Sequence, residues 1–196
     1  GGASTLFAFV LTSVTDFRQE HGWIFFCLPL AGLVIVFLYQ TFGKDDRGAN
    51  QVFSTISAKD DVPLKSALLI FVSTALTHLV GGSAGREGAV IQLGGSIGNQ
   101  LGRWIRLDEE DRHVMVMCGM SAAFAALFGT PMAAAVFAME VVSVGVMYYT
   151  ALVPCVIAAL IATKFAASMG IHPETFHVTN IPELTLETGI KMGVLA

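Results

Sequence analysis

Hydrophobic and polar positions alternate along the chain in blocks, and the apolar blocks predict its main elements. The cleanest block covers residues 23–42, about the 20 residues that a membrane-spanning helix needs, and it opens on Trp23, a residue type that favours the membrane interface. Polar stretches at 16–21, 43–65, 103–113 and 172–186 are predicted loops. In chain order, the apolar blocks lie at 4–15, 23–42, 66–80, 89–101, 114–128, 132–146 and 149–167.

Glycine and proline interrupt the shorter blocks, most clearly at Gly129-Thr130-Pro131. Short hydrophobic segments with such interruptions are typical of half-helices that meet near the middle of a bilayer. We therefore predict an all-α, polytopic membrane protein built from tilted and partly broken helices. Glycines at every fourth position, Gly94, Gly98 and Gly102, form a ridge of small residues over which helices can pack closely.

The composition of the chain also indicates a membrane protein rather than a soluble one. Of the 196 residues, 54% are hydrophobic and 13% are charged, against about 25% charged in ordinary soluble domains. The net charge of −4 is small, and no basic patch carries interleaved aromatic residues, which argues against nucleic acid as a partner. The three cysteines lie inside apolar blocks without metal-ligand spacing, so we expect neither a metal site nor a cofactor.

Lysine and arginine concentrate in the loops at 43–65 and 103–113, so the positive-inside rule predicts that these loops are cytoplasmic. If the blocks at 66–80 and 89–101 each cross the membrane once, the two loops share a side and the stretch at 81–88 faces the outside. Neither end of the chain shows the pattern of a signal peptide, and the chain does not begin with Met. We therefore expect residues 1–196 to be a piece of a longer protein.

The strongest chemical signal is the stretch GGSAGREG at 81–88, which places four glycines and two opposite charges between apolar blocks. A backbone rich in glycine can turn its N–H groups toward a closely approaching ligand. The helix predicted to begin near Gly88 adds the positive end of its dipole. Together these features predict an anion site at membrane depth.

Glu87 is an ionisable residue in this setting, which makes it a functional candidate. Ionised, its carboxylate can occupy the anion site as a tethered anion. Protonated, it can swing away and carry a proton, which would couple anion movement to proton movement. The alternative is that Arg86 and Glu87 form a structural ion pair, or that the stretch merely reaches water.

Three motifs in one order resemble the CLC family of anion channels and transporters: GREG at 85–88, QLGG at 92–95 and AALFGTPMA at 125–133. The resemblance covers roughly the first half of such a protein, so residues 1–196 are interpreted as the N-terminal half of its transmembrane domain. It implies an inverted-repeat fold in the bacterial inner (plasma) membrane, with many passes. It also implies a homodimer in which each subunit has its own pore and residues 132–165 supply part of the contact.

The same resemblance implies that Glu87 is the gating and proton-carrying glutamate. The loop at 48–52 takes the place of a family loop that contacts the anion from the inner side, where either Ala49 or Asn50 would stand next to it. An ordinary helix-capping turn is the alternative for this loop. The residues expected around the anion are Gly85, Arg86, Gly88 and Ala89 at the first stretch, and Gly48, Ala49 and Asn50 at the second.

Three departures from the family pattern resemble its fluoride-transporting branch: Ala89 replaces a proline, the serine of the inner loop is missing, and Val141 stands where proton-coupled chloride members carry a second glutamate. The neighbouring Glu140 has either a less direct role or a purely structural one. Members of this branch exchange fluoride for protons and export fluoride, which is the predicted function. The alternative is a chloride channel or chloride/proton exchanger of the same family. The inner proton route stays unexplained.

Two other classes of function compete with transport. A membrane-embedded enzyme could use Glu87 and His78 for acid–base work, but the sequence offers no nucleophile or metal set near them, and a structural role for His78 is the alternative. A nucleotide loop built on the glycines at 82, 85 and 88 lacks the preceding strand and the following Lys-Ser/Thr. We therefore predict a transporter or channel that handles halide ions and protons, and not an enzyme.

Overall fold

The computed structural model describes residues 1–43, 64–141 and 148–171, together with residues 185, 188 and 191. Helices account for all regular structure in these described ranges, so the predicted all-α class is confirmed. In chain order, the elements are α1 (Gly2–Glu20), the 3₁₀ turn η1 (Gly22–Cys27), α2 (Leu28–Phe42), α4 (Leu64–Leu79), α5 (Glu87–Trp104), α6 (Glu109–Phe128), α7 (Pro131–Glu140), the 3₁₀ turn η2 (Tyr149–Ala151) and α8 (Leu152–Ser168).

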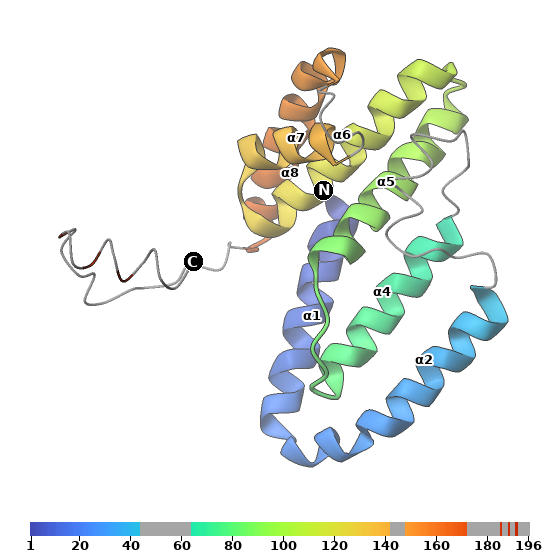
Figure 1. Ribbon diagram of the computed structural model, residues 1–196, viewed down its shortest axis with the longest axis vertical. Coiled ribbons are helices and arrows are strands. Elements are labelled where there is room, and N and C mark those ends of the chain that lie inside the picture. Colours follow the sequence, from blue (N-terminus) through green and yellow to red (C-terminus); the bar gives the residue numbers. More distant parts are fainter. Residues whose placement is uncertain (44–63, 142–147, 172–184, 186–187, 189–190, 192–196) are drawn as a thin grey trace.

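Helix α5 joins two groups of helices (Figure 1). On one side, α1, α2 and α4 pack together, and on the other α6, α7 and α8 do so. Helix α5 packs against α4 of the first group and most extensively against α6 of the second. The start of α5 lies between the two groups, near the middle of the long axis in Figure 1.

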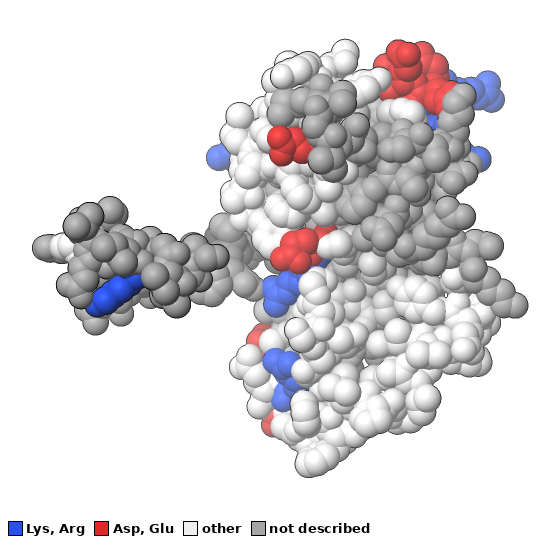
Figure 2. Space-filling model, in the orientation of Figure 1, with Lys and Arg blue, Asp and Glu red and all other residues white. Residues whose placement is uncertain are grey.

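Two helical stretches are long and apolar enough to cross a membrane, the continuous run Gly22–Phe42 with 21 residues and the run Tyr149–Ser168 with 20 residues. They match the predicted blocks at 23–42 and 149–167. Shorter apolar helices, α4 with 16 residues and α7 with 10, agree with the prediction of segments too short for a full span. Figure 2 shows broad uncharged areas on the visible face, and α2 exposes large apolar side chains such as Leu33 and Phe37.

Close packing of α5 on α6 follows from the predicted glycine ridge. A Cβ added at Gly98 would lie 2.5 Å from the carbonyl oxygen of Met115, and one added at Gly94 would lie 2.5 Å from the Cβ of Ala123. Both distances are too short for real atoms, so only glycine fits at these two positions. Gly119 of α6 faces Gly94 across the contact in the same way, and the spacing pattern did not single it out.

Two predicted loops are wrong in their extent. Residues 16–20 belong to α1, and the predicted loop at 103–113 shrinks to residues 105–108 because α5 continues to Trp104 and α6 begins at Glu109. The start of α6 has a clear cause: Asp108 Oδ1 accepts a hydrogen bond of 2.9 Å from the N–H of Asp111, and Glu109 and Glu110 favour the positive end of the helix dipole. Polar residues here extend helices beyond their apolar part.

The predicted break at 129–131 is present, and its residues explain it. Gly129 ends α6 in a left-handed conformation with φ 69°, where glycine avoids steric cost, and Pro131 takes the first position of α7. Helix α7 ends at Glu140, short of the predicted end at 146, and residues 142–147 lie outside the described ranges.

Candidate functional site

The glycine-rich stretch closes the end of α4 and then carries the chain to the start of α5. Gly81 has a φ of 83°, in the left-handed region that favours glycine. Its N–H donates to the carbonyl of His78 at 3.2 Å, and the N–H of Gly82 donates to the carbonyl of Thr77 at 2.8 Å. The following residues run without helical structure up to Arg86, so only the beginning of the stretch is a tight turn.

Helix α5 begins at Glu87, one residue before the predicted start, with Arg86 at its N-cap. Within the described part of the chain, no side chain caps this end by a hydrogen bond. The first N–H groups of a helix have no acceptor within the helix, and they carry the positive end of its dipole. The start of α5 is therefore a place where an anionic group is stabilised.

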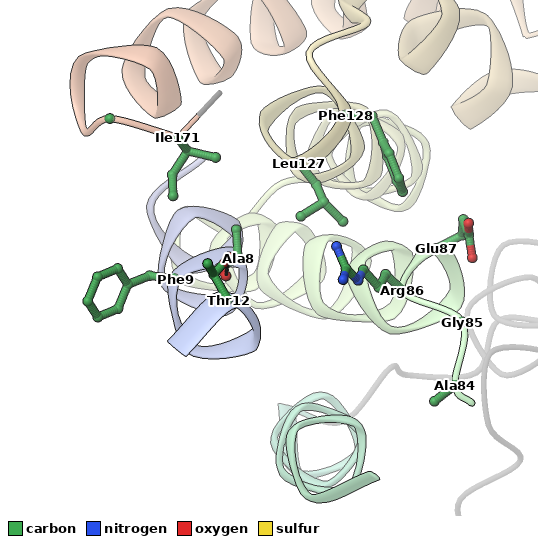
Figure 3. A pocket seen from close by; sticks show the side chains of 11 residues that line it. Ala8, Phe9, Thr12, Ala84, Gly85, Arg86, Glu87, Leu127, Phe128 and Ile171 are labelled. Atoms are coloured by element: carbon green, nitrogen blue, oxygen red, sulfur yellow. Dashed lines mark hydrogen bonds between the residues drawn. The ribbon is translucent and has the colours of Figure 1, made fainter. Parts of the chain in front are cut away.

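A cavity of about 740 Å³ opens at this helix start. Helix α1 supplies one wall, the end of α6 another, and the segment after α8 closes a third side (Figure 3). Arg86 points into the space next to Leu127, whereas Glu87 lies on the other side of the helix start, near Phe128 (Figure 3). The lining residues are Ala8, Phe9, Thr12, Ala84, Gly85, Arg86, Glu87, Leu127, Phe128, Gly170 and Ile171.

The carboxylate of Glu87 is exposed and lies over Gly85. Its Oε2 atom is 3.1 Å from the position that a Cβ on Gly85 would take. The missing side chain at Gly85 thus leaves room for the carboxylate beside the uncapped helix start. An exposed carboxylate in this position has room to change its orientation.

The structure brings some of the predicted site residues together and separates others. Gly85, Arg86 and Glu87 line the cavity, and Gly88 follows in the first turn of α5. The side chain of Ala89 instead packs in the core with Phe7, so only its backbone could face an anion. Gly48, Ala49 and Asn50 lie outside the described residues.

Val141 and Glu140, the two positions considered for a second acidic residue, lie at the end of α7. Val141 packs against an apolar cluster with members from α5, α6, α7, η2 and α8, and Glu140 is exposed. His78 has its Nδ1 atom 2.9 Å from the carbonyl oxygen of Thr74, which ties the ring to its own helix. Among the described residues, no three His, Cys, Asp or Glu side chains are close enough to hold a metal ion.

Thr12 and Phe9 of α1 line the cavity, and sequence reasoning did not identify them. Their position beside Arg86 and Glu87 joins segments far apart in the chain, which local spacing cannot reveal. The one available signal is weak: Ala8 and Thr12 stand four residues apart and so share a face of α1.

The family model described as Voltage gated chloride channel matches residues 31–196. The chain belongs to this family, the CLC family. A "Chloride/fluoride channel protein" of Pseudomonas syringae pv. tomato is 42% identical over 173 residues, which cover 87% of this chain and 38% of that protein. An "H(+)/Cl(-) exchange transporter" of Cronobacter sakazakii is 42% identical over 57 residues, 29% of this chain and 12% of that protein.

A crystal structure of a CLC-type fluoride/proton antiporter shares the fold, with a TM-score of 0.88 and 37% identity over 100% of this chain and 50% of the solved chain. The predicted fold and family are therefore confirmed, and the chain spans half or less of these CLC relatives. These relatives are channels and transporters, and none of their names describes an enzyme. The alternative of a membrane-embedded enzyme is dropped.

Proposed function

We propose that the CLC protein of which this chain is a part exchanges fluoride for protons and exports fluoride across the bacterial inner membrane. The observation that carries this proposal is the position of Glu87. Its carboxylate lies beside the uncapped start of α5, over Gly85 and at the cavity. A group in this place can compete with an anion for the same N–H groups.

Glu87 has two roles in the proposed cycle. In its ionised form, the carboxylate takes the place of the anion at the start of α5, where the helix dipole stabilises a negative charge. When it binds a proton, the side chain loses its charge and leaves the position to fluoride. Backbone groups of Gly85, Gly88 and Ala89 and the side chain of Arg86 are the proposed surroundings of the anion, with Gly48, Ala49 or Asn50 on the inner side.

We propose fluoride rather than chloride as the transported ion for two reasons. The solved fluoride/proton antiporter is 37% identical and covers 100% of this chain, whereas the chloride/proton exchanger matches over 57 residues. In addition, Val141 occupies the position that carries a glutamate in the proton-coupled chloride members that the chain resembles, and it packs in an apolar cluster. A chloride channel or chloride/proton exchanger is the second candidate.

The proposed assembly is a homodimer of complete subunits in the lipid bilayer. Helices α7 and α8 expose apolar side chains that another subunit could cover, among them Met132, Val153, Ile157 and Ile161. The second inverted repeat would complete each pore.

The test uses the full-length parent protein in liposomes loaded with either fluoride or chloride, with ion efflux and proton uptake followed together. We expect fluoride to move much faster than chloride, and Glu87→Gln to abolish proton uptake because an amide cannot carry the proton. Comparable chloride flux without protons would identify a channel instead. Absence of flux for both ions would refute the proposal of anion transport.

A further inference from the structure

One face of α5 carries polar side chains in the interior of the molecule. Gln92, Ser96 and Asn99 are 0%, 0% and 2% exposed. Their spacing of four and three residues places them on one side of the helix, and Arg103, four residues further, extends this side to the exposed C-terminal turn. These four residues are called the α5 polar face.

Gln92 and Ser96 contain buried polar atoms that no protein group satisfies. Among the described residues, the Nε2 and Oε1 atoms of Gln92 and the Oγ atom of Ser96 find no hydrogen-bond partner. Buried polar groups in native proteins are nearly always bonded to protein or to ordered water. An amide and a hydroxyl together donate and accept, which is what a buried water molecule requires of its surroundings.

Other buried hydroxyl groups of the molecule behave differently. Ser73 on α4 donates to the carbonyl of Ile70 at 3.2 Å, and Ser121 on α6 donates to the carbonyl of Cys155 at 3.0 Å. Both are satisfied by backbone, as is usual for serine in apolar helices. The unsatisfied atoms of the α5 polar face therefore call for a specific explanation.

The α5 polar face begins close to the gating position, on the same helix. Glu87 opens α5, and Gly88, four residues before Gln92, continues the line of the polar face without a side chain. Glu87 stands five residues before Gln92, so the two side chains leave the helix on different sides, and at about 1.5 Å per residue they lie about 7.5 Å apart along its axis. A path between them therefore needs several water molecules around the first turns of α5.

We propose that the α5 polar face holds a chain of water molecules and forms the inner proton route. This inference rests on the proposed function, because Glu87 must carry the proton. The Glu87 carboxyl gives its proton to water beside Gln92 and is left as a carboxylate. The proton then moves through water and the Ser96 hydroxyl, each of which accepts one proton and releases another. The Gln92 amide orients the water and keeps its own protons.

This route accounts for proton coupling without an acid at position 141. Val141 is apolar and packs against an apolar cluster that includes Ile91 of α5, so it cannot relay a proton. The α5 polar face instead leads toward the C-terminal end of α5, where Arg103 is exposed. By charge distribution, the loop that follows is the predicted cytoplasmic one.

The test compares full-length variants in liposomes, with fluoride efflux and proton uptake measured together. Gln92→Met keeps the length of the side chain and removes its hydrogen bonds, whereas Gln92→Glu keeps polar atoms in the same place. Ser96→Ala has a matched control in Ser121→Ala, which removes an equally buried hydroxyl from α6. Fluoride binding by calorimetry and the melting temperature in detergent report on folding.

We expect Gln92→Met and Ser96→Ala to slow both fluxes about tenfold, a barrier increase of about 1.4 kcal/mol. Fluoride binding should be unchanged in both variants. Gln92→Glu should keep transport near the wild-type rate, and Ser121→Ala should resemble the wild type. If Gln92→Met does not fold, Ser96→Ala decides alone. Wild-type fluxes in folded Gln92→Met or Ser96→Ala, or equal loss in Gln92→Glu, would overturn the route. A wild type without proton movement would instead refute the proposed antiport on which the route depends.

Discussion

Gly85 is the residue against which the Glu87 carboxylate rests, so its missing side chain is a testable part of the site. A Cβ at this position would lie 3.1 Å from Oε2 of Glu87. Because the crowded atom is the end of a flexible side chain, Gly85→Ala should displace the carboxylate and leave the fold intact. Misplacing a reacting group by a fraction of an ångström is costly, and we predict that fluoride efflux becomes about tenfold slower.

A fluoride electrode and thermal unfolding of the full-length variant in detergent measure these two effects. An unchanged melting temperature with slower efflux supports a gating role for the Glu87 carboxylate from its place over Gly85. Efflux at the wild-type rate would mean that the carboxylate does not act from this position.

At this scale, the sequence was a good guide only to residues that are neighbours in the chain. Gly85, Arg86 and Glu87 share one short stretch between two helices, and all three line the cavity. Ala89 was grouped with them by position, yet it stands two residues after Glu87, about half a turn of helix further, and its side chain therefore packs in the core. Thr12 reaches the same cavity from α1, because tertiary packing alone brings it there.

Among the helices, the contact between α5 and α6 depends on glycine at positions where backbones nearly touch. Gly98→Ala would place a Cβ 2.5 Å from the carbonyl oxygen of Met115, and a backbone atom cannot move aside as a side chain can. We predict a loss of about 1–3 kcal/mol in stability, as for other overpacked helix contacts. Thermal unfolding in detergent would show this as a lower melting temperature.

Gly32→Ala is the matched control for this prediction. Gly32 lies inside α2, and no atom of the residues that the structure describes is within 4 Å of the position its Cβ would take. Alanine is preferred over glycine in a helix interior by about 0.5–1 kcal/mol, so this variant should be equally or more stable. A similar decrease in both variants would mean that close packing of α5 on α6 is not the cause.

Helix ends were harder to predict than the helices themselves. An apolar block marks the part of a helix that faces lipid or the core. The helix itself continues beyond that part where the polar residues that follow or precede it favour helical structure. The last turn of α1 and the first turn of α6 are such continuations, the latter capped by Asp108. The break at Gly129 and Pro131 was predictable because both residues act locally on the backbone.

For the whole molecule, exposed apolar side chains on α2 and α8 form two candidate surfaces for contact with lipid or with another subunit. Leu33 on α2 and Ile161 on α8 are 68% and 65% exposed, so their present exposure does not distinguish them. In the proposed homodimer, the second subunit covers the side of α7 and α8, and Ile161 is shielded from lipid whereas Leu33 is not. A fluorescent label on either position would report this difference through quenching by brominated lipids.

The experiment uses the full-length protein with Cys27, Cys118 and Cys155 replaced by alanine and a single new cysteine, either Ile161→Cys or Leu33→Cys. We expect weaker quenching at 161 than at 33 in liposomes rich in protein. On dilution into excess lipid, quenching at 161 should rise as dimers separate, because shielding by a partner follows mass action. Shielding by the rest of the same chain would not change with dilution, and equal quenching at both sites would place the subunit contact elsewhere.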